Sequence, residues 1–308
     1  MPTLVAVNET TRLLRDDSVL HSDDYDIGGH KKWRKNKYKE HRGFRGEVTI
    51  GRGLSVDPKT GLSSLREVIA RRKPNEILMG GSIYALEKMF NVPCSVNVEY
   101  LNNIMNIGTS GQTITDKYPR ANGICLWTVG LGGCGDSRKD IRDVRQQQRQ
   151  LNQIIPFRVV DVPFAAGTPE ADTYWLMKRL DDGRYAYYAK IFARDPVIKP
   201  LWKDAAKDQD GSAVVESDFS SDRDTPIEVF SECVCVIDKE DFREWFDLYD
   251  NIDEVRFNEI GLCCGIKSHE EDGRPEYKQV RQLSCCHFTN EPLHMEKDMS
   301  IIYRWYSA

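Results

Sequence analysis

Residues 227–237 read IEVFSECVCVI and alternate between two kinds of side chain along their whole length. Successive side chains of a β-strand point to opposite faces of the sheet, so every second residue shares a face. One face of this segment is apolar and carries Ile227, Val229, Cys233, Cys235 and Ile237. The segment therefore predicts a strand that is buried on one face, in the C-terminal half of the chain.

Other apolar runs predict further strands before and after this segment. They lie at 124–129, 157–160, 173–180, 185–193, 254–265, 278–289 and 299–306. The third and fourth of these runs flank Asp181-Asp182-Gly183-Arg184, whose glycine supplies the positive φ that a tight hairpin needs. The pattern predicts a C-terminal half that is rich in antiparallel β-structure.

Helical patterns stand mainly in the N-terminal half. Ser64 and Glu67 have the spacing of a capping box, which predicts a helix that stops at Pro74. Two more short helices that pack on a core are predicted from apolar residues at helical spacing, namely Ile83, Leu86 and Phe90, then Val98, Leu101, Ile104 and Met105. A longer amphipathic helix is predicted over 238–249, capped by Asp238, from the stripe Phe242, Trp245, Phe246 and Tyr249.

These elements predict an α+β fold with short helices in the N-terminal half, an antiparallel β-rich C-terminal half and an extended N-terminal arm. We expect three regions along the chain. Residues 1–50 form the extended arm with acidic and then basic patches, and 51–160 form a mixed α/β region. Residues 161–308 form a β-rich domain that contains the amphipathic helix. No internal repeat is visible.

The arm carries its charge in blocks, because an acidic patch between Asp16 and Asp26 precedes a basic run with interleaved aromatic residues. The candidate interaction residues in this run are Lys31, Lys32, Trp33, Arg34, Lys35, Lys37, Tyr38 and Lys39. Arg and Lys bind phosphates while aromatic rings stack on bases, so one interpretation is contact with nucleic acid or with an acidic neighbouring subunit. The alternative is a solvated arm that lies on its own protein.

The overall composition is that of a globular protein. The 308 residues include 43 Lys and Arg against 48 Asp and Glu, a net charge of −5, which argues against binding nucleic acid through bulk positive charge. The apolar run Leu4–Val7 lacks the basic flank of a secretory signal, and no run approaches the roughly 20 apolar residues that span a bilayer. We therefore expect synthesis in the cytoplasm and no membrane contact.

One motif has the form of a nucleotide-binding loop. Gly130-Leu131-Gly132-Gly133-Cys134-Gly135 fits G-x-G-x-x-G, follows the predicted strand 124–129 and precedes a plausible helix over 141–154. In that interpretation, Asp161 would contact a ribose. The mixed charge at 136–140 and the lack of regular strand and helix alternation downstream argue against it. A tight, irregular connection is the favoured interpretation, and a nucleotide-binding enzyme is the alternative.

The chain has nine cysteines, and six of them cluster in predicted strands as Cys233, Cys235, Cys263, Cys264, Cys285 and Cys286. Adjacent cysteines of a strand point to opposite faces and cannot both bind one zinc ion. Disulfides across strands or between subunits remain open, and buried thiols are the favoured interpretation. A nucleophile made of Cys285 or Cys286 with His294 has no supporting loop signature. We expect no catalytic residue, no cofactor and no metal site.

Several stretches, taken in order, resemble a virion structural protein of tailed bacteriophages. They are Met79–Phe90, the glycine-rich Val129–Gly135, Ile155–Arg158, Arg256–Leu262, and Glu291–Leu293 through Lys297 into Ile301–Tyr306. The resemblance implies a non-enzymatic component that assembles as a ring in the head-tail neck or in the tail and baseplate. Its implied partners are copies of itself and other virion proteins, with packaged DNA as a further contact of the basic arm. Its implied location is the virion, after synthesis in the host cytoplasm.

Overall fold

A computed structural model describes residues 44–90, 94, 100–107, 123–134, 141–144, 150–151, 153–202, 227–247, 256–269, 275–292 and 298–307. The chain divides into two units, Met1–Arg42 and Gly43–Ala308, and every described residue belongs to the second. Most of the predicted arm therefore lies outside the described residues. Its boundary at residue 50 is wrong, because Phe44–Val56 is strand β1 and pairs on both sides.

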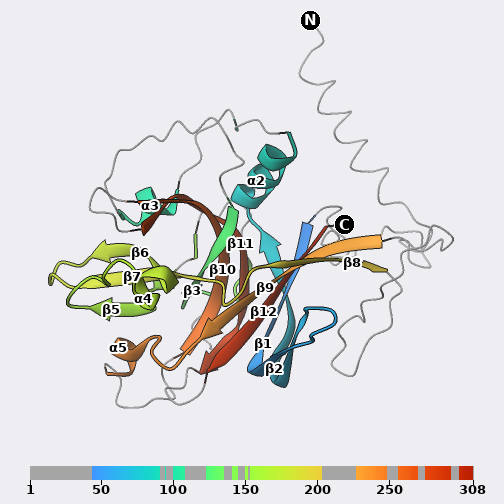
Figure 1. Cartoon of the computed structure of the whole chain (residues 1–308), viewed down its shortest axis with the longest axis horizontal. Coiled ribbons are helices and arrows are strands. Elements are labelled where there is room, and N and C mark those ends of the chain that lie inside the picture. The colour runs from blue at the N-terminus through green and yellow to red at the C-terminus, as the bar shows by residue number, and fades with distance from the viewer. Residues whose placement is uncertain are drawn as a thin grey trace, which may run out of the picture. The chain divides into compact units, whose positions relative to one another are not determined.

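The described strands form one 12-stranded sheet with antiparallel pairing throughout the part of the chain that the structure covers (Figure 1). The strand order is β5-β7-β3-β10-β11-β2-β1-β12-β9-β8, with β4 on β3 and β6 on β7. The bounds are β1 Phe44–Val56, β2 Ser63–Ile77, β3 Gly123–Gly130, β4 Ile154–Ile155, β5 Arg158–Val160, β6 Tyr174–Arg179, β7 Tyr185–Ile191, β8 Val197–Trp202, β9 Ile227–Ile237, β10 Arg256–His269, β11 Pro275–Pro292 and β12 Met299–Ser307.

The helices of the described residues are short. They are α2 Met79–Phe90, α3 Leu101–Ile104, α4 Pro169–Thr173 and α5 Arg243–Phe246. The fold is thus α+β and dominated by antiparallel sheet, as the sequence predicts. The sheet also interleaves strands from the predicted regions 51–160 and 161–308, since β3 lies between β7 and β10. The described residues of those two regions therefore build one unit together.

The helix predicted after Ser64 is a strand. Residues 63–66 alternate between buried and exposed, which is the period of a strand rather than that of a helix. Ser64 shares a hydrogen bond of 2.8 Å with Ser55 across the β1–β2 hairpin, where the capping-box interpretation would have it bind the backbone near Glu67. Cross-strand pairing with β1 outweighs the local capping signal in this segment.

Strand β9 forms over the predicted residues, but its burial is not confined to one face, because Glu228, Phe230, Glu232 and Val234 of the other face are buried as well. Cys233, Cys235 and Ile237 point into the main core, together with Trp127 of β3. Phe230 instead packs on Tyr306 of β12, with ring centroids 5.4 Å apart. Val229 departs from the predicted pattern because it is exposed near the margin of the sheet. β9 is therefore central to the core over most of its length.

The helix predicted over 238–249 begins only at Arg243. Lys190 of β7 donates hydrogen bonds to the carboxylates of Asp238 and Asp241, and Asp238 also caps the backbone N–H of Glu240 at 2.9 Å. These bonds hold residues 238–241 in a turn. Phe242 then takes a left-handed φ of 62° and is fully buried, so the predicted first turn of the helix does not form.

Candidate interaction surface

Helix α2 packs on strand β11 through its two glycines. A side chain at Gly80 would place its Cβ 2.7 Å from the backbone oxygen of Gln282, and one at Gly81 would collide with the backbone oxygen of Leu283. The backbone of the helix therefore approaches the strand closely, as small residues permit. Figure 1 shows α2 at one end of the sheet beside β11 and β2.

An ion pair fixes the same side of the helix to the sheet. Arg281 of β11 donates to a carboxylate oxygen of Glu87 over 3.0 Å, and both side chains are largely buried. Lys88 lies over the ring of Tyr84, with Nζ 5.3 Å from the ring centroid. Glu87 and Lys88 are the charged residues of α2, and neither faces outward as the exposed residues do. The two glycines and Glu87 thus lie on the side of α2 that faces the protein.

The opposite side of α2 is exposed to solvent and mostly apolar, with Ser82 as a polar residue among the apolar ones. The exposed fractions are 48% for Met79, 56% for Leu86, 64% for Met89 and 70% for Phe90. With 100° between successive residues, these four side chains fall on one stripe, which we call the α2 stripe. An exposed, contiguous group of large apolar side chains is typical of a surface that binds another protein.

The sequence predicted that Leu86 and Phe90 pack on the core, and this is wrong. The apolar spacing correctly predicted a helix but indicated the wrong buried side. The side with Gly80 and Gly81 packs on β11, because glycines permit the closest approach, and the apolar side faces solvent. The signal that could have revealed the orientation is the Gly80-Gly81 pair. This pair lies on the side of the helix opposite to Leu86 and Phe90, together with Glu87 and Lys88.

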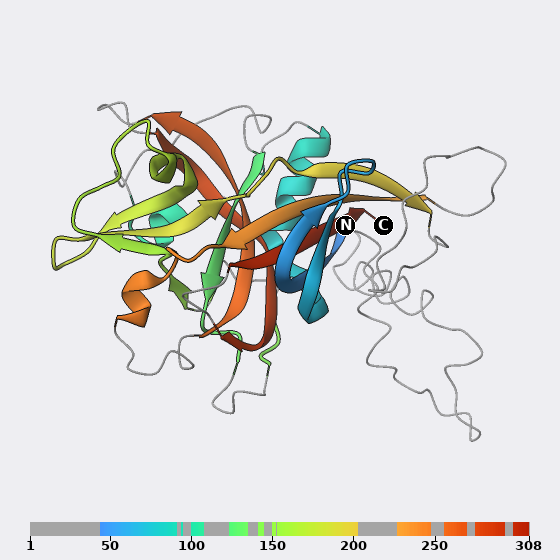
Figure 2. The same cartoon turned by 60° about the horizontal axis from the view of Figure 1, so that its bottom comes forward.

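A second apolar group lies on β8, at one end of the strand order. Ile198 is 70% exposed, and Val229 on the neighbouring strand β9 is exposed on the same face, opposite Pro200. Figure 2 shows β8 in yellow along the margin of the sheet, beside β9 in orange. Pro200 has no N–H, and prolines at sheet margins limit the pairing of further strands. β8 is therefore better suited to contact a partner through its apolar side chains than through backbone hydrogen bonds along its free edge.

The glycine-rich segment is packed against strand β10. Gly132 donates its N–H to a carboxylate oxygen of Glu259 at 3.0 Å, and Gly133 donates to the side-chain oxygen of Asn258 at 2.7 Å. A side chain at Gly130 or Gly133 would collide with Glu259 or with the backbone of Asn258. These glycines are explained by that close approach, and their amides serve the chain's own side chains.

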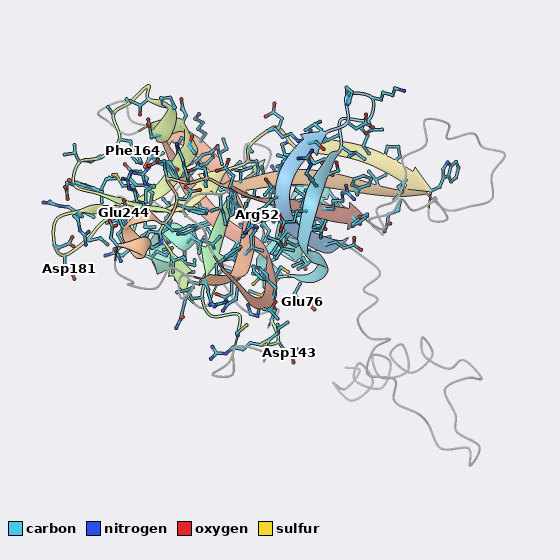
Figure 3. The ribbon with its side chains drawn as sticks, turned by 90° about the horizontal axis from the view of Figure 1, so that it is seen from below. Arg52, Glu76, Asp143, Phe164, Asp181 and Glu244 are labelled. Carbon is cyan, nitrogen blue, oxygen red and sulfur yellow. The ribbon has the colours of Figure 1, made fainter. Side chains whose placement is uncertain are left out.

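The other parts of the nucleotide-binding motif take different structures. Ile141 forms a bridge with Cys134, and Ile154–Ile155 is strand β4, so the described residues within 141–154 are not helical. The plausible helix over that range is therefore wrong at those residues. Asp161 follows β5 and is exposed. Arg158, at the start of β5, lies over the ring of Phe164 and pairs with the carboxylate of Glu244 at 3.8 Å. Figure 3 shows Phe164 and Glu244 in the same part of the molecule.

The six clustered cysteines are buried thiols, with no disulfide among them in the described part of the chain. Adjacent cysteines do point to opposite faces, as predicted, because Cys263 and Cys264 lie in separate apolar clusters, and so do Cys285 and Cys286. Burial raises the pKa of Cys233 to about 12. It also raises the pKa values of Cys235, Cys263 and Cys285 well above 9.0. Reactive thiolates are not expected at these four positions.

The candidate arm residues Lys31, Lys32, Trp33, Arg34, Lys35, Lys37, Tyr38 and Lys39 lie outside the described residues. Within the described ranges, no group of three or more His, Cys, Asp and Glu side chains could hold a metal ion. Nor does that part of the chain contain a helix with the length and apolar character needed to cross a membrane.

Comparisons with known proteins give no relative. No protein-family model, no curated protein and no solved structure matches the chain.

Proposed function

We propose that this chain is a non-enzymatic structural component of a tailed-bacteriophage virion. It assembles as a ring in the head-tail neck or in the tail and baseplate, through contacts with its own copies and with other virion proteins. The observation that carries the proposal is the α2 stripe of Met79, Leu86, Met89 and Phe90, which is apolar and exposed.

The α2 stripe supports assembly because a helix normally buries its apolar face. The stripe contains no charged side chain, so contact with a second copy would leave no buried charge without a partner. Fully burying an exposed large apolar side chain contributes roughly 1.5–3 kcal/mol, and a few such residues near the centre of an interface carry most of its binding energy. Ile198 and Val229 supply a second apolar face for a different neighbour.

The basic run of the arm is assigned to a neighbour or to packaged DNA. A segment with so few apolar residues gains little from packing on its own core, and a partner that binds it compensates the entropy of ordering it. The alternative function, a nucleotide-binding enzyme, would need the amides of the glycine-rich segment. Gly132 and Gly133 instead donate to Glu259 and Asn258.

Mass spectrometry of purified phage particles, with and without reductant, tests membership of the virion. The proposal predicts this chain in every particle, at a fixed ratio of several copies. Comparison of the two samples also reports whether cysteines join subunits. Absence of the chain from particles would refute the proposal.

Charge introduced into the α2 stripe tests the interface itself. Leu86→Lys combined with Phe90→Lys should weaken self-association at least tenfold, since each lysine would have to be desolvated in the contact. Val162→Lys is the matched control, because Val162 is 74% exposed and lies outside α2. If both variants associate as the wild type does, the stripe is not the contact surface.

A further inference from the structure

Glu259 and His287 lie directly opposite each other on the neighbouring strands β10 and β11. His287 Nε2 is 2.8 Å from a carboxylate oxygen of Glu259, and both side chains are almost completely buried. The second oxygen of the same carboxylate accepts the N–H of Gly132. One buried pair therefore connects two central strands to the glycine-rich segment.

The partners of His287 determine its protonation. Its Nδ1 lies 2.8 Å from the backbone oxygen of Arg142, and a carbonyl oxygen only accepts hydrogen bonds, so Nδ1 must carry a proton. The other nitrogen, Nε2, faces a carboxylate oxygen, which also only accepts when ionised. The 2.8 Å approach of Nε2 to this oxygen is favourable when Nε2 also carries a proton, because the ring is then positive beside a carboxylate. Because Glu259 also accepts from the backbone, the arrangement corresponds to an imidazolium and a carboxylate.

We propose that the protonated pair of His287 and Glu259 is a pH-sensitive lock that holds the glycine-rich segment 130–134 and Arg142 on β10 and β11. When His287 loses its proton, the Nε2 lone pair faces the carboxylate, and the contacts through Gly132 and Arg142 weaken. We call this pair the proton lock. It does not depend on the proposed role in a virion.

The charged and titratable groups around the lock come from three elements. They are Glu259 on β10, Cys285 and Cys286 on β11, and the side chain of Arg142. Burial acts to lower the pKa of His287, but its contacts with Glu259 and with the backbone of Arg142 prevail and raise it above 6.5. A raised pKa in the folded state means that the stabilisation is complete below pH 6.5 and is lost as the pH rises through the higher value.

Hydrogen exchange of the Gly132 and Gly133 amides tests the lock in the intact chain. Their protection factors, corrected for intrinsic exchange, should fall by up to roughly tenfold per pH unit between pH 6.5 and the raised pKa of His287, and level off above it. The amide of Ile260, within the paired part of β10, should keep its protection. Constant protection at Gly132 and Gly133 from about pH 6 to pH 9 would overturn the proposal.

Glu259→Gln separates the charge from the shape of the site. The amide can donate to a neutral Nε2 while its oxygen accepts from Gly132, so protection at Gly132 should no longer depend on pH. Glu240→Gln is the matched control, because Glu240 pairs with Arg243 on the surface and should leave the pH dependence unchanged.

The nitrogen chemical shifts of the His287 ring in the wild type report its protonation directly, so they test the proposal even if Glu259→Gln does not fold. Both ring nitrogens should be protonated at about pH 6.5, and the transition should occur at higher pH. A neutral ring at that pH would overturn the proposal.

Discussion

Arg304 of β12 donates its Nε hydrogen to the buried carboxylate of Glu232 on β9, over 2.9 Å. Arg194 binds the other carboxylate oxygen at 2.7 Å, and the backbone N–H of Ser63 donates to that same oxygen. Glu232 thus joins β9, β12, the start of β2 and the segment after β7. A carboxylate without solvent contact depends on all of these partners.

Arg304→Met should destabilise the protein by about 3 kcal/mol, because it removes one cation from a buried carboxylate. Urea unfolding measures this change as a shift of the midpoint. Arg52→Met is the control, since Arg52 pairs with the largely exposed Glu67 and its loss should cost less than about 1 kcal/mol. Equal effects of the two substitutions would contradict the account of Glu232.

Gly81→Ala should destabilise the protein by about 1–2 kcal/mol, although alanine favours helix more than glycine does. The new Cβ would collide with the backbone oxygen of Leu283, which cannot move without disturbing β11. Gly123→Ala is the control, because a Cβ at Gly123 meets no atom within 4 Å. Thermal unfolding compares the two. A Gly81→Ala protein more stable than the wild type would show that α2 does not need its close approach.

Asp241 should make stability depend on pH in the acid range. Burial raises its pKa from 3.8 to about 6, against the opposing effect of Lys190. The folded state therefore binds this proton more tightly, and the associated stability is present below pH 3.8 and lost as the pH rises through about 6. The unfolding free energy of the wild type, relative to Asp241→Asn, should fall by about 3 kcal/mol across this range. Parallel pH profiles of the two proteins would contradict this assignment.

The basic run of the arm should contribute a salt-dependent part of any DNA binding. Replacing Lys35 and Lys37 by alanine removes two cations, and the slope of log K against log salt should decrease by about 2 if both contact phosphates. Lys59→Ala with Lys239→Ala gives a matched pair of lysines from the body of the protein. An unchanged slope in the arm variant would contradict contact of Lys35 and Lys37 with DNA phosphates.

Apolar runs predicted the strands of the C-terminal half because such runs mark buried segments of a sheet, although burial in β9 is not confined to alternate residues. β9 occupies the residues expected, and the turn Asp181–Arg184 forms with Gly183 at a φ of 91°. Local patterns failed where distant residues intervene. Lys190 binds Asp238 and Asp241 and shortens the predicted helix, and cross-strand pairing overrides the capping signal at Ser64.

The candidate surface was harder to predict from the sequence than the fold. Helical spacing cannot distinguish an apolar stripe that faces the core from one that faces a partner, and Leu86 shows the second case. The G-x-G-x-x-G spacing likewise gave no sign that Glu259, more than a hundred residues further along, would accept the Gly132 N–H. In both cases the deciding contact comes from a strand that is remote in sequence.

Native mass spectrometry of the purified full-length chain tests the central claim most directly, since it counts the copies in each species. The account predicts one discrete assembly of several copies that persists upon dilution to low micromolar concentration. A monomer alone, even at the highest soluble concentration, would contradict it.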